Sequence, residues 1–134
     1  MKIILDTHVL VWLCEGNARL GKKALKMINQ ALAHEQLVVA TISFWEIAML
    51  VEKGRLKMLI KVADFRRKLL ADGLSEVPLS GSVAIIAAAL TEFHGDPADR
   101  IIVATALEEG MVVVTADKKI LSWPGLKDKV DATK

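Results

Sequence analysis

The segment MVVVTAD, residues 111–117, carries the strongest fold signal in the sequence. Its three consecutive valines are typical of a strand that is buried on both faces of a parallel sheet. Gly110 stands directly before this stretch and ends a helical pattern that begins at Pro97. A buried strand that directly follows a helix indicates an α/β domain, in which helices cover both faces of the sheet.

The rest of the chain repeats this alternation of short apolar runs and helical periodicity. Further strands are predicted at residues 2–5, 37–40 and, more weakly, 74–77. Helices are predicted over residues 9–13, 21–34, 43–53, 60–71, 83–93 and 97–109. Because crossovers between parallel strands are right-handed, the pattern predicts a three-layer α/β/α domain with a central parallel sheet of four or five strands. We expect this domain to span residues 1–127, with residues 128–134 as a tail that frays.

The composition fits one small globular domain and excludes several other classes. The 134 residues are 53% hydrophobic and 25% charged with a net charge of +2, which excludes intrinsic disorder. The longest uncharged apolar stretch, residues 83–90, is far shorter than the ~18 residues that cross a membrane. Asp6 interrupts the apolar N-terminal run and no cleavage site follows, and Cys14 has no second cysteine to pair with. We therefore expect a cytoplasmic protein without membrane attachment.

Four acidic residues stand where the predicted strands end or the predicted helices begin. Asp6 directly follows the first strand, and Asp117 lies two residues past the valine strand. Glu46 and Asp99 fall on the first turns of helices. Since the helices run antiparallel to the strands, all four positions fall at the carboxyl edge of the sheet, where open α/β sheets bind ligands.

Each of these acids also has a purely structural explanation. The segment SFWE (43–46) fits a capping box. Asp96 precedes a proline and fits an N-cap, which puts Asp99 at the third helical position. Asp6 and Asp117 fit as caps of the helices that follow them, where the helix dipole favours acids. One alternative is therefore a non-catalytic interaction module, which would bind no divalent metal.

Taken together, the four acids predict a metal site. Carboxylates that crowd into one cleft repel each other unless a cation or protonation balances them. Mg²⁺ or Mn²⁺ suits an all-oxygen set of ligands, lowers the pKa of a bound water and supports displacement at a phosphodiester. The candidate metal ligands and catalytic residues are Asp6, Glu46, Asp99 and Asp117.

Other chemistries lack their motifs in this sequence. There is no G-x-G-x-x-G, G-x-x-x-x-G-K-[ST] or G-x-S-x-G motif, and no two histidines have the i, i+4 spacing of a helical zinc pair. The segment DTH (6–8) lacks the second aspartate of haloacid-dehalogenase-like phosphatases. The remaining enzymatic alternative is a phosphatase-like or receiver-like domain with an acidic Mg²⁺ pocket, in which Asp6 would become phosphorylated.

Around these acids the sequence resembles the PIN-domain family, specifically the VapC-type toxins of bacterial type II toxin–antitoxin modules. The matching segments follow the family's order over about residues 2–125: LDTHVLVWL (5–13), TISFWEIAMLVEKGRL (41–56), HGDPADRIIVATAL (94–107) and VVVTAD (112–117). The chain departs from the family at Ala98, where a phenylalanine is common.

The resemblance implies a metal-dependent endoribonuclease that uses Mg²⁺ or Mn²⁺. It also implies an RNA substrate, a cognate antitoxin protein that covers the cleft, and a homodimer. The family's site acids match Asp6, Glu46, Asp99 and Asp117.

Several neighbouring residues are secondary candidates. Thr115 is a candidate to orient an acid, and Arg100 to contact a phosphate or pair with an acid. The pair KK (118–119) lies just past the last acid and is a candidate phosphate contact. Core packing is favoured over base stacking for the tryptophans, Trp12, Trp45 and Trp123.

Overall fold

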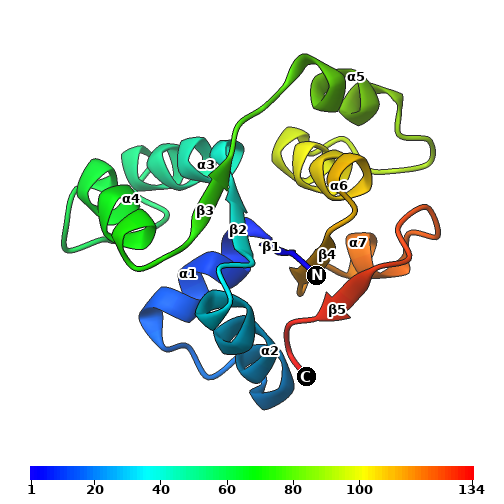
Figure 1. The fold of residues 1–134 in the computed structure, drawn as a ribbon. Coiled ribbons are helices and arrows are strands. Elements are labelled where there is room, and N and C mark those ends of the chain that lie inside the picture. The colour runs from blue at the N-terminus through cyan, green and yellow to red at the C-terminus, as the bar shows by residue number, and fades with distance from the viewer.

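Five parallel strands form the central sheet, in the order β3-β2-β1-β4-β5 (Figure 1). The structure is a computed structural model that describes residues 1–134. The strands are β1 (Ile3–Leu5), β2 (Leu37–Ala40), β3 (Ser75–Val77), β4 (Val112–Thr115) and β5 (Lys129–Asp131). This sheet confirms the predicted α/β fold.

Seven helices connect or flank the strands. They are α1 (Thr7–Glu15), α2 (Lys22–Ala33), α3 (Thr41–Glu52), α4 (Val62–Ala71), α5 (Gly81–Ala89), α6 (Pro97–Glu109) and α7 (Lys118–Ser122). No helix combines the length and the apolar character that crossing a membrane requires.

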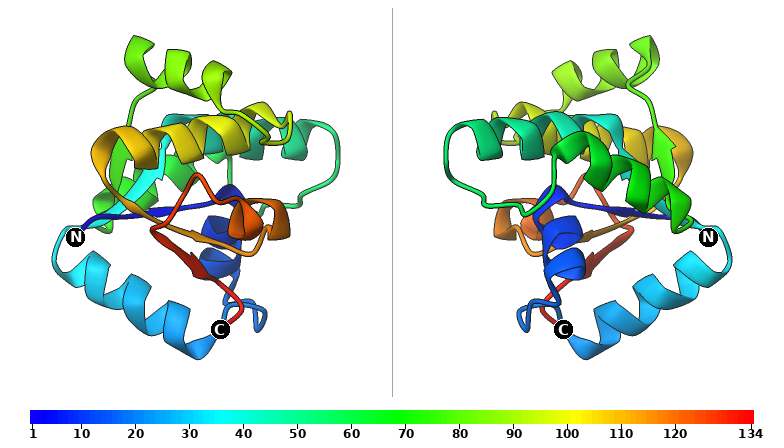
Figure 2. Two further views of the ribbon diagram at one scale, coloured as in Figure 1. Left: turned by 90° about the vertical axis from the view of Figure 1, so that its right-hand side faces the viewer. Right: turned by 90° about the vertical axis from the view of Figure 1, so that its left-hand side faces the viewer.

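The side chains of the strands alternate between two apolar cores, one on each face of the sheet. On one face, Ile3 and Leu5 pack with residues of α1, α2 and α4. On the other face, Ile4 and Val113 pack with residues of α6 and α7. Figure 2 shows α5 as the outermost helix, lying over α6. The arrangement is therefore a three-layer sandwich with α5 added outside one layer.

The valine strand lies in the interior of the sheet, as its sequence predicts. β4 pairs with β1 on one side and with β5 on the other, and all four of its residues are buried. Burial on both faces leaves no position for a polar side chain until Thr115, whose hydroxyl faces the carboxyl edge and contacts Asp6.

The C-terminus differs from the expectation, because residues 128–134 do not form a fraying tail. Lys129–Asp131 pair with β4 as the edge strand β5, and Ala132 is fully buried. Backbone hydrogen bonds join Val113 to Asp128 and Ala132 to Thr115. An edge strand needs few apolar side chains because one side of it faces solvent, so the polar segment KDKVDATK (127–134) gives little strand signal.

Two helices also differ from the predicted pattern. α5 ends at Ala89, and the chain then turns so that Phe93 packs into the core from a loop. The short helix α7 has no predicted bounds, because its five residues carry too little periodicity, and only the capping explanation for Asp117 pointed to a helix here.

Candidate metal centre

The carboxyl edge of the sheet brings the four predicted acids into one cluster. Asp6 follows β1, and Asp117 lies two residues past the adjacent strand β4. Glu46 comes from the second turn of α3 and Asp99 from the first turn of α6. The negative charges of the other three acids all act on Asp99, which shows that the four carboxylates lie within electrostatic reach of one another.

Asp6 stands at the N-cap position of α1 but does not cap the helix. Its side chain accepts no hydrogen bond from the first turn of α1, although its backbone is extended as an N-cap requires. Instead, Oδ2 accepts a 2.6 Å hydrogen bond from the Thr115 hydroxyl, and Oδ1 is buried without a partner. Burial of this side chain, which is 3% exposed, raises the pKa of Asp6. The capping explanation for Asp6 is therefore wrong.

Glu46 does not belong to a capping box either. Helix α3 begins at Thr41, directly after β2, so Ser43 lies inside the helix rather than at its start. The hydroxyl of Ser43 accepts a 2.9 Å hydrogen bond from Thr7. Glu46 Oε1 is buried and unpartnered, and burial, with the nearby charge of Asp96, raises the pKa of Glu46.

Asp96 and Asp117 do cap helices, as predicted. Asp96 Oδ1 accepts a 3.0 Å hydrogen bond from the Asp99 amide, at the start of α6. Asp117 Oδ1 accepts a 2.7 Å hydrogen bond from the Lys119 amide, at the start of α7. A carboxylate has about four acceptor sites on its two oxygens, so a single cap bond leaves Asp117 free to bind a ligand as well.

Asp99 lies at the centre of the cluster. Its side chain is nearly buried, and burial together with the charges of the surrounding acids raises the pKa of Asp99 to about 8. Around neutral pH the cluster therefore carries a proton or is balanced by a cation. Oδ1 of Asp6 and Oε1 of Glu46 are buried and make no well-aligned hydrogen bond, although Thr7 lies close enough to both carboxyls to lower their pKa values in part. These two oxygens favour a cation.

His94 lies beside the acids but is not among the residues that the sequence predicts for the site. Its Nε2 lies 3.2 Å from Asp99 Oδ2, and ligand atoms of His94, Asp99 and Asp117 all lie within 4.8 Å of one another. His94 comes from the loop between α5 and α6, five residues before Asp99. That spacing does not match a helical metal pair, and the only signal in the sequence is that the HGDPADR segment begins with a histidine.

Arg100 contacts neither an acid nor the cluster. Its guanidinium donates hydrogen bonds to five backbone carbonyls at the end of α5 and in the loop that follows, those of Ala87, Ala88, Leu90, Phe93 and His94. Because these bonds occupy the guanidinium, the predicted phosphate contact or acid pair is wrong. Arg100 instead fixes the loop that carries His94.

The surface around the acids is charged. Lys118 and Lys119 are exposed beside Asp117. Trp45 is 54% exposed, so the prediction that it packs in the core is wrong, whereas Trp12 and Trp123 are partly buried. Trp45 directly precedes Glu46 on α3, but neighbouring residues of a helix do not face one another, so the exposed ring is not part of the acid cluster.

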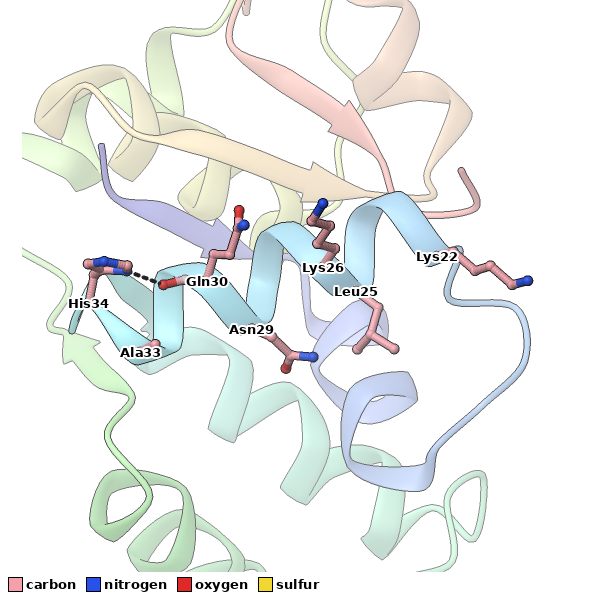
Figure 3. Close-up of a pocket in the computed structure, with 7 residues that line it drawn as sticks. All are labelled: Lys22, Leu25, Lys26, Asn29, Gln30, Ala33 and His34. Carbon is pink, nitrogen blue, oxygen red and sulfur yellow. Dashed lines mark hydrogen bonds between the residues drawn. The ribbon is translucent and has the colours of Figure 1, made fainter.

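A separate hollow lies elsewhere on the surface. It is an open groove of about 570 Å³ along α2, lined by residues between Lys22 and His34 (Figure 3). Residues of α2 and His34, which directly follows it, supply all of the lining, and none of the lining residues is an acid. It therefore does not share the chemistry of the acid cluster.

The raised pKa of Asp99 predicts how the stability of the metal-free protein depends on pH. The carboxyl of Asp99 holds its proton in the folded state up to a pH of about 8 but loses it near 3.8 in the unfolded state. The folded state therefore binds more protons between these values, and stability falls as the pH rises. Solvent screening reduces the effect below the full linkage value, because Asp99 is only partly buried. We expect the Tm in EDTA to fall by roughly 5 °C between pH 5 and pH 8 beyond the change in a D99N variant, a difference of about 1–2 kcal/mol.

Metal should reverse this trend. Because the ligands bind a cation in their deprotonated form, adding Mn²⁺ should raise the Tm more at pH 8 than at pH 5. Differential scanning fluorimetry measures both effects. A Tm in EDTA that does not depend on pH, or that responds to Mn²⁺ equally at both pH values, would contradict the prediction.

Known proteins are similar to this chain in fold and in sequence. The family model of the PIN domain matches residues 3–124. Ribonuclease VapC22 of Mycobacterium tuberculosis is 40% identical over 121 residues, which cover 90% of each chain. Among solved structures, a toxin–antitoxin complex from Klebsiella pneumoniae has a chain with a TM-score of 0.64 and 21% identity, covering 98% of both chains. VapBC2 from Rickettsia felis, bound to a DNA fragment from its promoter, has a chain with a TM-score of 0.69 and 16% identity, covering 98% of this chain and 100% of that one.

The structural likenesses show the fold, and the sequence matches extend over almost the whole chain. They confirm the resemblance that the four sequence segments indicate. The chain belongs to the PIN-domain family.

Proposed function

We propose that this protein is a metal-dependent endoribonuclease that acts as the toxin of a toxin–antitoxin module. The observation that carries the proposal is the cluster of four carboxylates at the carboxyl edge of the sheet, two of which hold buried oxygens without any partner. The 40% identity to Ribonuclease VapC22 supports RNA as the substrate.

The residues of the cluster fit a divalent cation. All four predicted ligands are carboxylates, and hard cations such as Mg²⁺ and Mn²⁺ prefer oxygen ligands. The orphaned Oδ1 of Asp6 and Oε1 of Glu46 are atoms that a cation would satisfy. We assign the principal ligands as Asp6 and Asp99, with Glu46 and Asp117 completing the acidic shell directly or through water.

When bound, such a cation supplies an activated water and charge stabilisation at a phosphodiester. The chain itself fixes the positions of the carboxylates. Thr115 holds Asp6 through its short hydrogen bond, and the cap of α7 fixes Asp117. We assign Glu46 to accept a hydrogen bond from the attacking water, a role that its unpartnered Oε1 and raised pKa support.

An antitoxin partner and a cytoplasmic location complete the proposal. The solved structures with this fold include a toxin–antitoxin complex and a VapBC2 complex. We infer that a cognate antitoxin binds this protein and covers the acid cluster, so that the protein encounters RNA in the cytoplasm only when it is released.

Metal removal tests the proposed activity. Wild-type protein incubated with total RNA should produce discrete fragments in Mn²⁺ or Mg²⁺ and none in excess EDTA, and adding back Mn²⁺ should restore cleavage. EDTA should also weaken RNA binding, because an acidic cluster without a cation repels phosphates. Gel mapping of the fragments and fluorescence anisotropy with a labelled RNA measure the two effects. Cleavage that persists in EDTA would exclude the proposed mechanism.

A further inference from the structure

Two hydroxyl groups are buried where α1 meets α3. Thr7 is 1% exposed and Ser43 is fully buried, whereas the other buried residues of these two helices are apolar. The Thr7 hydroxyl donates a 2.9 Å hydrogen bond to the Ser43 hydroxyl. Replacing both partners of a buried hydrogen bond with apolar groups of similar shape is nearly neutral for stability, so packing alone does not require this pair. The presence of two hydroxyls in an apolar contact therefore favours a role other than packing.

The two hydroxyls belong to the segments that carry two of the predicted metal ligands. Thr7 directly follows Asp6, and Ser43 precedes Glu46 by three residues on α3. Residues three apart on a helix lie on the same face, so Ser43 and Glu46 point the same way from α3. The hydrogen bond between Thr7 and Ser43 therefore links the end of β1 to the helix face that carries Glu46.

Thr7 also lies beside both carboxyl groups. Its amide acts on the Asp6 carboxyl and its hydroxyl on the Glu46 carboxyl, and each contact lowers the pKa of that acid in part, against the larger effect of burial. Thr7 is the hydrogen-bonding group that acts on Glu46, whereas the other groups around that carboxyl, Asp6, Asp96 and His8, act through charge alone. Thr7 therefore touches both acids whose buried oxygens are left for a cation.

We propose that Thr7 is a positioning residue, which keeps Asp6 and Glu46 at the spacing that a cation bound at the cluster requires. Ser43 fixes the Thr7 hydroxyl from the other side. The proposal rests on the proposed function, because it needs a divalent cation at the acid cluster. Thr7 acts through the two carboxylates and binds neither the metal nor the RNA. Groups that orient metal ligands change metal affinity by about 10- to 100-fold when they are removed.

Manganese binding, measured by calorimetry without RNA, tests this role independently of cleavage. T7V removes the hydroxyl but keeps the shape of the side chain, so it should weaken Mn²⁺ affinity by about 10-fold or more, whereas T7S should stay within about threefold of wild type. The matched control is Thr105, a buried threonine whose hydroxyl donates a 2.7 Å hydrogen bond to the Ile101 carbonyl within α6. T105V should bind Mn²⁺ as wild type does. Equal Mn²⁺ affinity of T7V and wild type would refute the proposal.

A double variant separates positioning from stability. T7V alone leaves the buried Ser43 hydroxyl without its partner, so its Tm in EDTA should fall. T7V/S43A removes both hydroxyls, and its Tm in EDTA should return to within about 3 °C of wild type. Its Mn²⁺ affinity should nevertheless stay about 10-fold or more below that of wild type. Recovery of Mn²⁺ affinity together with the Tm would show that the pair is purely structural and would overturn the proposal.

A mutant cycle with E46Q tests whether Thr7 acts through Glu46. T7V leaves the amide that acts on Asp6 in place, so its effect on Mn²⁺ affinity should pass through Glu46. Glutamine keeps the shape of Glu46 but removes the charged group that Thr7 orients. Adding T7V to E46Q should therefore change Mn²⁺ affinity by less than about twofold. An effect of T7V that is equally large in the wild-type and E46Q backgrounds would contradict the proposal.

This proposal and the proposed function fail differently. If wild-type protein binds no Mn²⁺, both fail together. If wild type binds Mn²⁺ but does not cleave RNA, the ribonuclease function fails, and the Mn²⁺ affinities still decide the role of Thr7. If wild type binds Mn²⁺ and cleaves RNA while T7V binds Mn²⁺ equally well, only the assignment of Thr7 fails.

Discussion

The D99N variant should lose at least about 10³-fold in RNA cleavage while keeping the fold of the wild type. Asp99 lies at the centre of the cluster, where the charges of the other three predicted ligands all act on it. Asparagine preserves the shape of the side chain but removes the charge that a cation needs. The cap of α6 is a hydrogen bond from the backbone amide of residue 99 to the Asp96 side chain, so the substitution leaves the start of the helix intact.

The same substitution should stabilise the metal-free protein. Burial and neighbouring acids raise the pKa of Asp99 to about 8, so holding this group charged at high pH opposes folding. We expect the Tm of D99N in EDTA to exceed that of wild type at pH 8 and to respond little to Mn²⁺. An ordinary structural aspartate would behave in the opposite way, with loss of stability on substitution.

An exposed aspartate provides the control for both measurements. Asp72 lies at the end of α4, outside the cluster, so D72N should cleave RNA and melt like wild type. Full activity of D99N, or a D99N protein that is unfolded by circular dichroism, would contradict the prediction.

The order of strands and helices was predictable because most elements carry a local sequence pattern, either a short apolar run or helical periodicity. β2 (Leu37–Ala40) has the predicted bounds because an uninterrupted apolar run marks it. α6 (Pro97–Glu109) has the predicted bounds because a proline marks its first turn and a glycine follows its last residue. β5 was not predictable, since Lys129–Asp131 form a strand only through pairing with β4, a contact that the local sequence does not encode.

The topology predicted that the acids lie at one edge of the sheet, but it did not predict which of them form hydrogen bonds that cap helices. Parallel strands with antiparallel helices dictate that Asp6, Glu46, Asp99 and Asp117 share an edge. Which acids also cap helices depends on where each helix begins, and α3 begins two residues before the predicted start. The loop between α5 and α6 was the least predictable part, because tertiary hydrogen bonds rather than periodicity place His94 and Arg100.

Replacing Arg100 with methionine should lower the free energy of unfolding by about 2–4 kcal/mol, and the Tm by roughly 10 °C, even though the residue is not in the acid cluster. Helix α5 ends in an extended residue, Leu90, without a glycine cap, so its last carbonyls depend on another donor. The guanidinium of Arg100 supplies that donor and joins α5 to the loop through Phe93 and His94. R100K should recover little, because an ammonium offers three donors without the planar geometry of the guanidinium.

The matched control is Arg66, an exposed arginine on α4 that pairs with Glu76 at 2.6 Å. Exposed ion pairs contribute about 0–1 kcal/mol, so R66M should melt within a few degrees of wild type. Hydrogen exchange should show faster exchange of the amides of residues 90–96 in R100M than in R66M. Because the loop also holds His94, RNA cleavage by R100M should fall at temperatures well below its Tm. An R100M protein that melts with wild type would show that the loop is held by the packing of Phe93 and Trp123 alone.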